Sequence, residues 1–185
     1  MARTESRMLP LGTPAPDFSL PEPLNKRTVG LDDIAGDKAT LVMFICNHCP
    51  FVKHLFDGLV RLGHDYADQP AGLVAISSND VTGYPQDRPE RMAELARDKG
   101  FAFPYLFDES QNIARAFSAA CTPDFFVFDG QRRLVYRGQF DDSRPGNDQP
   151  VTGRDVRAAL DALLADQPVS NNQKPSIGCN IKWKD

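Results

Sequence analysis

The sequence predicts a single α/β domain over residues 1–185, with a mixed central sheet flanked by helices. Two observations support this fold class. Strand-like and helix-like segments alternate along most of the chain, and a hairpin with one further helix follows them. The chain contains neither an internal repeat nor a linker-like composition, so we expect one hydrophobic core.

The composition excludes several classes of protein. The hydrophobic share is 41%, the net charge is −4, and no segment approaches the length of a transmembrane span. We therefore expect neither nucleic acid nor a membrane as partner. The N-terminal residues lack the apolar region of a signal peptide, which predicts a cytoplasmic location. In that reducing compartment the four cysteines should be thiols, transient disulfides or metal ligands.

The first third of the chain predicts short elements and one buried strand. Residues 1–9 are polar and are expected to be loose. Prolines then limit regular structure to two short strands, Phe18–Leu20 and Thr28–Leu31, and a helical turn ending at Ile34. The apolar run Leu41–Ile45 has the length and residue types of a buried strand.

The middle of the chain alternates between helices and strands. Apolar residues at helical spacing predict a helix over Phe51–Tyr66, and a buried strand is expected at Ala71–Ser77. Pro89 suits the first turn of a helix that ends at Gly100. A strand at Phe103–Phe107 and a short helix, capped by Asp108 and ending near Phe117, complete this part.

The last third predicts a hairpin, a helix and a tail. Strands at Phe125–Phe128 and Leu134–Phe140 flank the hairpin signal D-G-Q-R-R. Thr152 is a suitable cap for a helix through Leu164. The tail, residues 167–185, is polar and loop-like except for its final segment I-G-C-N-I-K-W-K-D.

The chemistry is expected at Cys46 and Cys49, which lie three residues apart at a strand-to-helix junction. A helix N-terminus stabilises a thiolate through unpaired N–H groups and the helix dipole. The spacing also allows a small, reversible disulfide. His48 lies between the two cysteines, and its charge, when protonated, would lower the thiol pKa values further.

Zinc is the competing interpretation, because C-x-x-C is half of a tetrahedral site that Cys121 and Cys179 would complete. The sequence contains no second C-x-x-C or H-x₃-H pair, so we expect no metal or other cofactor. A non-catalytic module, with cysteines that bind zinc or simply pack, stays as the alternative from another class.

The strand, C-x-x-C, helix and later Thr122-Pro123 before a strand together resemble the thioredoxin fold. The resemblance implies a cis Pro123 beside the dithiol and a Thr122 backbone offered to an extended substrate. The segment G-T-P-A-P-D-F-S-L resembles the N-terminal segment of the peroxiredoxin superfamily of alkyl hydroperoxide reductase and thiol-specific antioxidant proteins. The extra strand and helix between residues 84 and 120 fit the same superfamily. C-N-H-C-P-F-V-K and G-C-N-I-K-W are similar to a bacterial peroxiredoxin-like group with a C-x-x-C.

The resemblance implies two different roles for the same cysteines. In the manner of thioredoxin, Cys46 is the more exposed thiol and attacks, and Cys49 resolves. In the manner of peroxiredoxins, Cys49 is the peroxidatic residue. The peroxiredoxin threonine is replaced by Cys46, however, and the family arginine falls on Pro123, which removes two groups that position peroxide. A thiol-disulfide oxidoreductase with an antioxidant or redox role is therefore the leading prediction, and a thiol peroxidase using Cys49 is its alternative.

The expected partners are a protein disulfide or hydroperoxide substrate and a thioredoxin-type or small-thiol reductant, for a monomer or homodimer. Cys121 is either a buried filler or a neighbour of the dithiol. Cys179 is a possible resolving thiol if the tail docks near the site. Otherwise the apolar residues around it simply anchor a terminal strand or loop.

Overall fold

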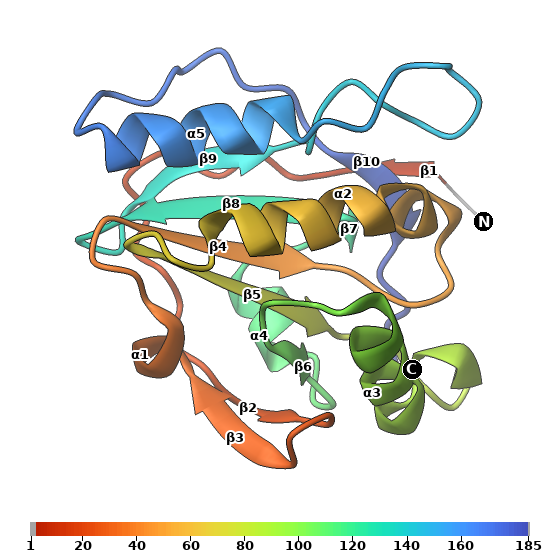
Figure 1. The fold of residues 1–185 in the computed structure, drawn as a ribbon. Coiled ribbons are helices and arrows are strands. Elements are labelled where there is room, and N and C mark those ends of the chain that lie inside the picture. Colours follow the sequence, from red (N-terminus) through yellow and green to blue (C-terminus); the bar gives the residue numbers. More distant parts are fainter. Residues whose placement is uncertain (1–2, 185) are drawn as a thin grey trace.

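The computed structural model describes residues 3–184 and is built on a five-stranded mixed sheet with the order β6-β5-β4-β8-β9 (Figure 1). The central strand β4 is parallel to β5 and antiparallel to β8; β5 is parallel to β6, and β8 is antiparallel to β9. This arrangement confirms the expected mixed sheet. The strands are β4 (Ala39–Phe44), β5 (Ala71–Ser77), β6 (Tyr105–Phe107), β8 (Asp124–Asp129) and β9 (Leu134–Gly138).

Helices cover both faces of this sheet, so two apolar clusters form (Figure 1). Alternate residues of β4 point to opposite faces. Leu41 packs in the cluster that includes residues of α2, α3 and α5, whereas Val42 packs in the cluster that includes residues of α4, β2 and β3. The helices are α1 (Leu31–Ile34), α2 (Pro50–Tyr66), α3 (Pro89–Lys99), α4 (Asn112–Ala116) and α5 (Arg154–Leu164), with a 3₁₀ turn η1 (Pro85–Asp87). The small hairpin is β2 (Ser19–Glu22) and β3 (Arg27–Gly30).

A third sheet brings the two ends of the chain together beside the strand that precedes β8. Its order is β1 (Arg3–Glu5), β10 (Ile177–Asn180) and β7 (Cys121–Thr122). The expectation that residues 1–9 are loose is therefore wrong for residues 3–5, which pair with β10. Residues 1–2 lie outside the described part of the chain. The pairing joins segments at opposite ends of the sequence, so the local pattern contained no sign of it.

Two helices begin later than the sequence suggests. The short helix expected from Asp108 begins at Asn112, because the buried Asp108 carboxylate accepts a hydrogen bond from the Ala114 N–H at 2.9 Å instead of occupying the cap position. The last helix has Gly153 as its N-cap residue, and the Thr152 hydroxyl accepts the N–H of Arg154 at 3.2 Å. Within residues 3–184, no helix combines the length and apolar composition needed to cross a bilayer.

Candidate active site

The two motif cysteines flank the turn that joins β4 to α2. Cys46 follows the end of β4 at Phe44, and Cys49 is the N-cap residue of α2. Pro50 occupies the first helical position, where the proline's missing N–H is not needed. Both cysteines are fully buried, at 0% exposure. The expectation that Cys46 is the more exposed thiol is thus wrong, because both sulfurs are buried against Thr122.

Cys49 is the residue whose thiolate the site stabilises. Hydrogen bonds from Cys46, from Cys179 and from the backbone N–H of Val52 outweigh burial and lower the pKa of Cys49 to about 5. The N-terminus of the 17-residue helix α2 directs its dipole at the same sulfur. The site therefore favours the ionised form of Cys49.

Cys46 has the opposite environment and remains a thiol. The hydrogen bond that it donates to Cys49, its burial and the negative charge of Asp87 raise its pKa well above the ordinary value. The Thr122 hydroxyl, 3.3 Å from the Cys46 sulfur, has the opposite effect and lowers the pKa of Cys46. The two thiols of the motif thus differ strongly in acidity.

Thr122 and Pro123 lie where the resemblance places them. Their peptide bond is cis, as expected. The Thr122 hydroxyl faces Cys46, and the Thr122 carbonyl oxygen lies 3.3 Å from the sulfur of Cys49. One residue of β7 therefore contacts both sulfurs of the motif.

Cys179 is also brought to this site, from the C-terminal strand β10. It lies opposite Thr122 in the β10–β7 pairing, and its sulfur is 2.7 Å from that of Cys49. Burial and the hydrogen bond to Cys49 raise the pKa of Cys179 to about 12. Cys121 differs from these three: its sulfur meets the Pro123 carbonyl at 3.5 Å, and burial raises its pKa.

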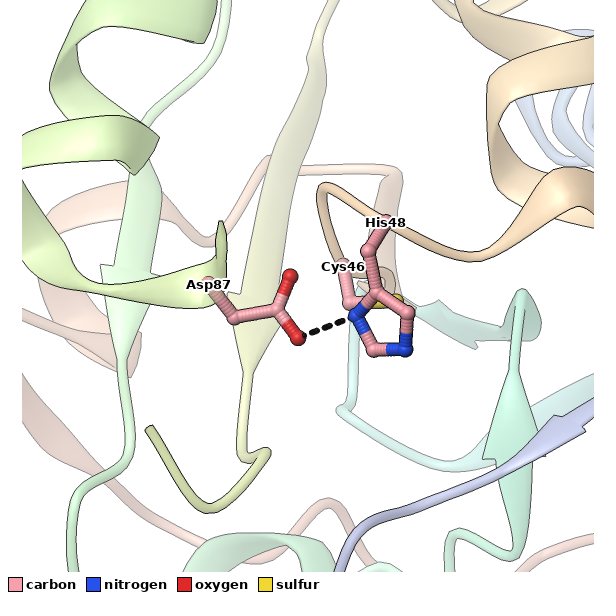
Figure 2. A group of neighbouring side chains, drawn as sticks. All are labelled: Cys46, His48 and Asp87. Atoms are coloured by element: carbon pink, nitrogen blue, oxygen red, sulfur yellow. Dashed lines mark hydrogen bonds and ion pairs between the residues drawn. The ribbon is translucent and has the colours of Figure 1, made fainter. Parts of the chain in front are cut away.

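His48 lies close to Cys46 and is held by the carboxylate of Asp87, which was not predicted from the sequence (Figure 2). Its Nδ1 is 2.7 Å from Oδ2 of Asp87, and its ring stacks on Tyr84 with centroids 5.1 Å apart. Nε2 of His48 is buried without a hydrogen-bond partner among the described residues. Only one ring nitrogen of His48 is thus engaged.

Asp87 also fixes the backbone of the cysteine motif. It is fully buried, and its Oδ1 accepts the N–H of Asn47 at 2.8 Å. Its Oδ2 accepts a second hydrogen bond, from Asn79 at 2.8 Å. Asp87 lies in a polar segment, 39 residues beyond His48, that looks like an ordinary turn. No local sequence signal distinguishes it from a surface aspartate.

The donor atoms of Cys46, His48 and Asp87 lie within 4.8 Å of one another, and soft and imidazole ligands of this kind suit zinc. This set differs from the four-cysteine site of the competing zinc interpretation, since neither Cys121 nor Cys179 belongs to it. His48 and Asp87 are already hydrogen-bonded to each other, and a metal would have to replace their shared proton.

The fold, the cis-proline and the buried thiols at a helix N-terminus define a redox protein of the thioredoxin-like class. The sequence model of the AhpC/TSA family matches residues 11–137, and the chain belongs to that family. A thioredoxin domain of a thiol-disulfide oxidoreductase from Bacteroides vulgatus superposes with a TM-score of 0.61 at 18% identity, covering 81% of this chain and 97% of that one. This likeness confirms the thioredoxin fold.

Two solved structures are similar over the full chain. A protein from Geobacillus kaustophilus, described as an uncharacterized conserved protein, is 56% identical with a TM-score of 0.98, covering 100% of this chain and 97% of that one. A hypothetical protein from Sinorhizobium meliloti 1021 is 49% identical with a TM-score of 0.95, covering 98% of each chain. The N-terminal and C-terminal segments that form the third sheet are therefore within the region of similarity.

Proposed function

We propose that this protein is a thiol-disulfide oxidoreductase in which Cys49 attacks and Cys46 resolves. The Cys49 thiolate attacks one sulfur of a substrate disulfide, forms a mixed disulfide and releases the first thiolate, which takes up a proton. Cys46 then loses its proton, attacks the sulfur of Cys49 and releases the second thiol. Two electrons pass to the substrate, and the protein retains a Cys46–Cys49 disulfide.

The unequal acidity of the two thiols is the observation that carries this proposal. The attacking sulfur must be ionised, and the site lowers the pKa of Cys49 to about 5 while it raises that of Cys46. The order of events is therefore the reverse of the thioredoxin-type order in which Cys46 attacks. In this proposal a charge on His48 modulates the pKa values of the two thiols. Thr122 and Pro123 contact the bound substrate beside the dithiol.

The wider role follows from the chemistry of a dithiol. A thioredoxin-type protein or a small thiol would reduce the Cys46–Cys49 disulfide after each turnover, giving an antioxidant or redox role. A reducing compartment such as the cytoplasm favours that direction. A monomer or a homodimer can perform the cycle, since both sulfurs belong to one chain.

Equilibration in dithiothreitol redox buffers, followed by alkylation and peptide mass spectrometry, tests the proposal. A Cys46–Cys49 disulfide that forms and disappears reversibly is expected. In a Cys179→Ser background and with glutathione in place of dithiothreitol, Cys46→Ser should accumulate a mixed disulfide at Cys49, whereas Cys49→Ser should accumulate none. Cys121→Ser is the matched control and should behave like the wild type. A protein without a reversible Cys46–Cys49 disulfide contradicts the proposal.

Thiol peroxidase activity is the second candidate, favoured by AhpC/TSA family membership and the Cys49 thiolate. Cys49 would attack a hydroperoxide, release the alcohol and become a sulfenic acid, which the thiol of Cys46 or of Cys179 converts to a disulfide with loss of water. Peroxide consumption coupled to a thioredoxin system, lost in Cys49→Ser and retained in Cys46→Ser, would support this candidate. Turnover no faster than that of a free thiol would reject it.

Zinc binding is the remaining candidate, favoured by the Cys46, His48 and Asp87 donors. Stoichiometric zinc in the purified protein, with no thiol that alkylates rapidly at neutral pH, would support a metal-binding module. Metal-free protein with a rapidly alkylated Cys49 would reject it.

A further inference from the structure

We propose that the C-terminal strand β10 is an internal substrate of the dithiol, whose Cys179 exchanges disulfide bonds with Cys49. The inference rests on the proposed thiol exchange at Cys49 and adds a third redox thiol to it. It also assigns a function to the docking of the chain's C-terminal segment.

The pairing of β10 with β7 places Cys179 at the reacting sulfur. The two strands are antiparallel, with Cys179 opposite Thr122 and Asn180 opposite Cys121. Thr122 is the residue that contacts the sulfurs of both Cys46 and Cys49. A strand added beside β7 in this register therefore presents the side chain opposite Thr122 to Cys49. In β10 that side chain is a thiol, 2.7 Å from the Cys49 sulfur.

The residues around Cys179 fit this position closely. A Cβ on Gly178 would lie 2.0 Å from the Thr122 carbonyl oxygen, so the approach requires glycine. Beyond Cys179, the Ile181 N–H bonds the Ala120 carbonyl at 3.1 Å, and the Ile181 side chain is buried at 1% exposure. The strand is thus held on both sides of the cysteine.

A hydrogen-bond chain also links this strand to the cysteine motif. The Lys182 N–H donates to Asn79 at 2.9 Å, Asn79 donates to Asp87 at 2.8 Å, and Asp87 accepts the N–H of Asn47 at 2.8 Å. One hydrogen-bond network therefore joins the segment that follows β10 to the loop of the cysteine motif.

The exchange needs no external electron. In the protein with a Cys46–Cys49 disulfide, Cys179 loses its proton and attacks the sulfur of Cys49. The Cys46–Cys49 bond breaks, a Cys49–Cys179 bond forms, and Cys46 takes up the proton. One disulfide moves from one partner of Cys49 to the other, and the oxidation state of the protein is unchanged.

The arrangement has a consequence for substrates. While β10 is seated, the position on β7 from which a polypeptide cysteine would reach Cys49 is occupied. A polypeptide substrate must first displace β10, and a Cys49–Cys179 disulfide would prevent that displacement. Oxidation thus latches the C-terminal strand over the site.

Disulfide mapping of the full chain tests the inference. Wild type, Cys46→Ser, Cys179→Ser and the control Cys121→Ser are equilibrated in glutathione redox buffers, acid-quenched, alkylated and mapped by peptide mass spectrometry. Wild type and Cys121→Ser should contain both Cys46–Cys49 and Cys49–Cys179. Cys46→Ser should contain Cys49–Cys179 alone, and Cys179→Ser should contain Cys46–Cys49 alone. A Cys46→Ser protein that carries only glutathionylated Cys49 would overturn the inference.

The outcomes separate this inference from the proposed function. Cys46–Cys49 without any Cys49–Cys179 in wild type keeps the proposed function and overturns the internal substrate. A wild type that contains Cys49–Cys179 but no Cys46–Cys49 overturns the proposed function and keeps the internal substrate. A wild type that contains neither disulfide overturns both proposals. Amide hydrogen exchange gives a second readout in wild type as well: exchange at residues 177–180 should slow severalfold on oxidation, but not in Cys179→Ser. Equal exchange in oxidised and reduced wild type would contradict the latch.

Discussion

The sulfur of Cys179 lies 2.7 Å from the sulfur of Cys49, although the two residues are 130 positions apart in the chain. This contact also lowers the pKa of Cys49. Cys49 accepts hydrogen bonds from both Cys46 and Cys179, so one thiolate is stabilised between two thiols. In the proposed reaction, the nucleophile Cys49 therefore has two resolving partners, Cys46 and Cys179.

The acidity of Cys49 predicts its alkylation behaviour. The rate of iodoacetamide modification of Cys49 should rise as the pH passes through about 5 and then level off, because only the thiolate reacts. Cys46→Ala and Cys179→Ala each remove a hydrogen-bond donor and should move the midpoint to higher pH. Mass spectrometry of native, reduced protein over a pH series measures the rates, with Cys121→Ala as control. A midpoint near the ordinary value of 9.0 would contradict the site as described.

A larger residue at position 178 should unseat the C-terminal strand. In Gly178→Ala the added Cβ meets the Thr122 carbonyl at 2.0 Å, so β10 must shift away from β7. We expect at least a tenfold loss of Cys49–Cys179 disulfide in glutathione buffers, with Cys46–Cys49 retained. Gly83→Ala, whose new Cβ meets only an aspartate oxygen at 3.3 Å, is the control. Unchanged disulfide populations in Gly178→Ala would show that the register of β10 is not needed.

Much of the fold was predictable because local patterns determine it. The apolar run of β4 is buried on both faces, and the helical spacing of α2 gives one buried side, so both were recognised. The pairing of β1 with β10 could not be predicted in this way, because it depends on hydrogen bonds between the two ends of the chain. A short polar strand has no pattern of its own.

The residues of the site also fall into two groups, those that the local sequence predicts and those that it does not. Cys46, Cys49 and the cis Thr122-Pro123 bond follow from motifs that are continuous in sequence or familiar from a fold. Asp87 does not follow from any such motif, because its place in the site depends on its burial and on a 2.7 Å contact with His48, which is distant in the sequence. The exposure of the two motif thiols also does not follow from the motif, because both are fully buried and both contact Thr122 of β7.

Neutralising Asp87 should change the acidity of Cys46. The negative charge of Asp87 is one cause of the raised Cys46 pKa, so Asp87→Asn should lower that pKa. Measured in a Cys49→Ser background, the alkylation midpoint of Cys46 should move to lower pH. Asp98→Asn, which removes an exposed charge on α3, should leave the midpoint unchanged. A purely structural role for Asp87 would lower stability in Asp87→Asn without moving the midpoint.

The Thr122 hydroxyl should assist the second half of the reaction and not the first. It lies 3.3 Å from the sulfur of Cys46 and lowers the pKa of that thiol, and hence favours the thiolate that resolves the mixed disulfide. Thr122→Val keeps the shape and removes the hydrogen bond, whose loss costs about 0.5–1.5 kcal/mol, or roughly twofold to tenfold in rate. Stopped-flow release of thionitrobenzoate from a mixed disulfide at Cys49, in a Cys179→Ser background, measures the resolving step. The rate of that step should fall by this factor in Thr122→Val, whereas formation of the mixed disulfide should be unchanged. Thr28→Val, an exposed substitution on β3, is the control, and a resolving rate equal to that of Thr28→Val would remove Thr122 from the mechanism.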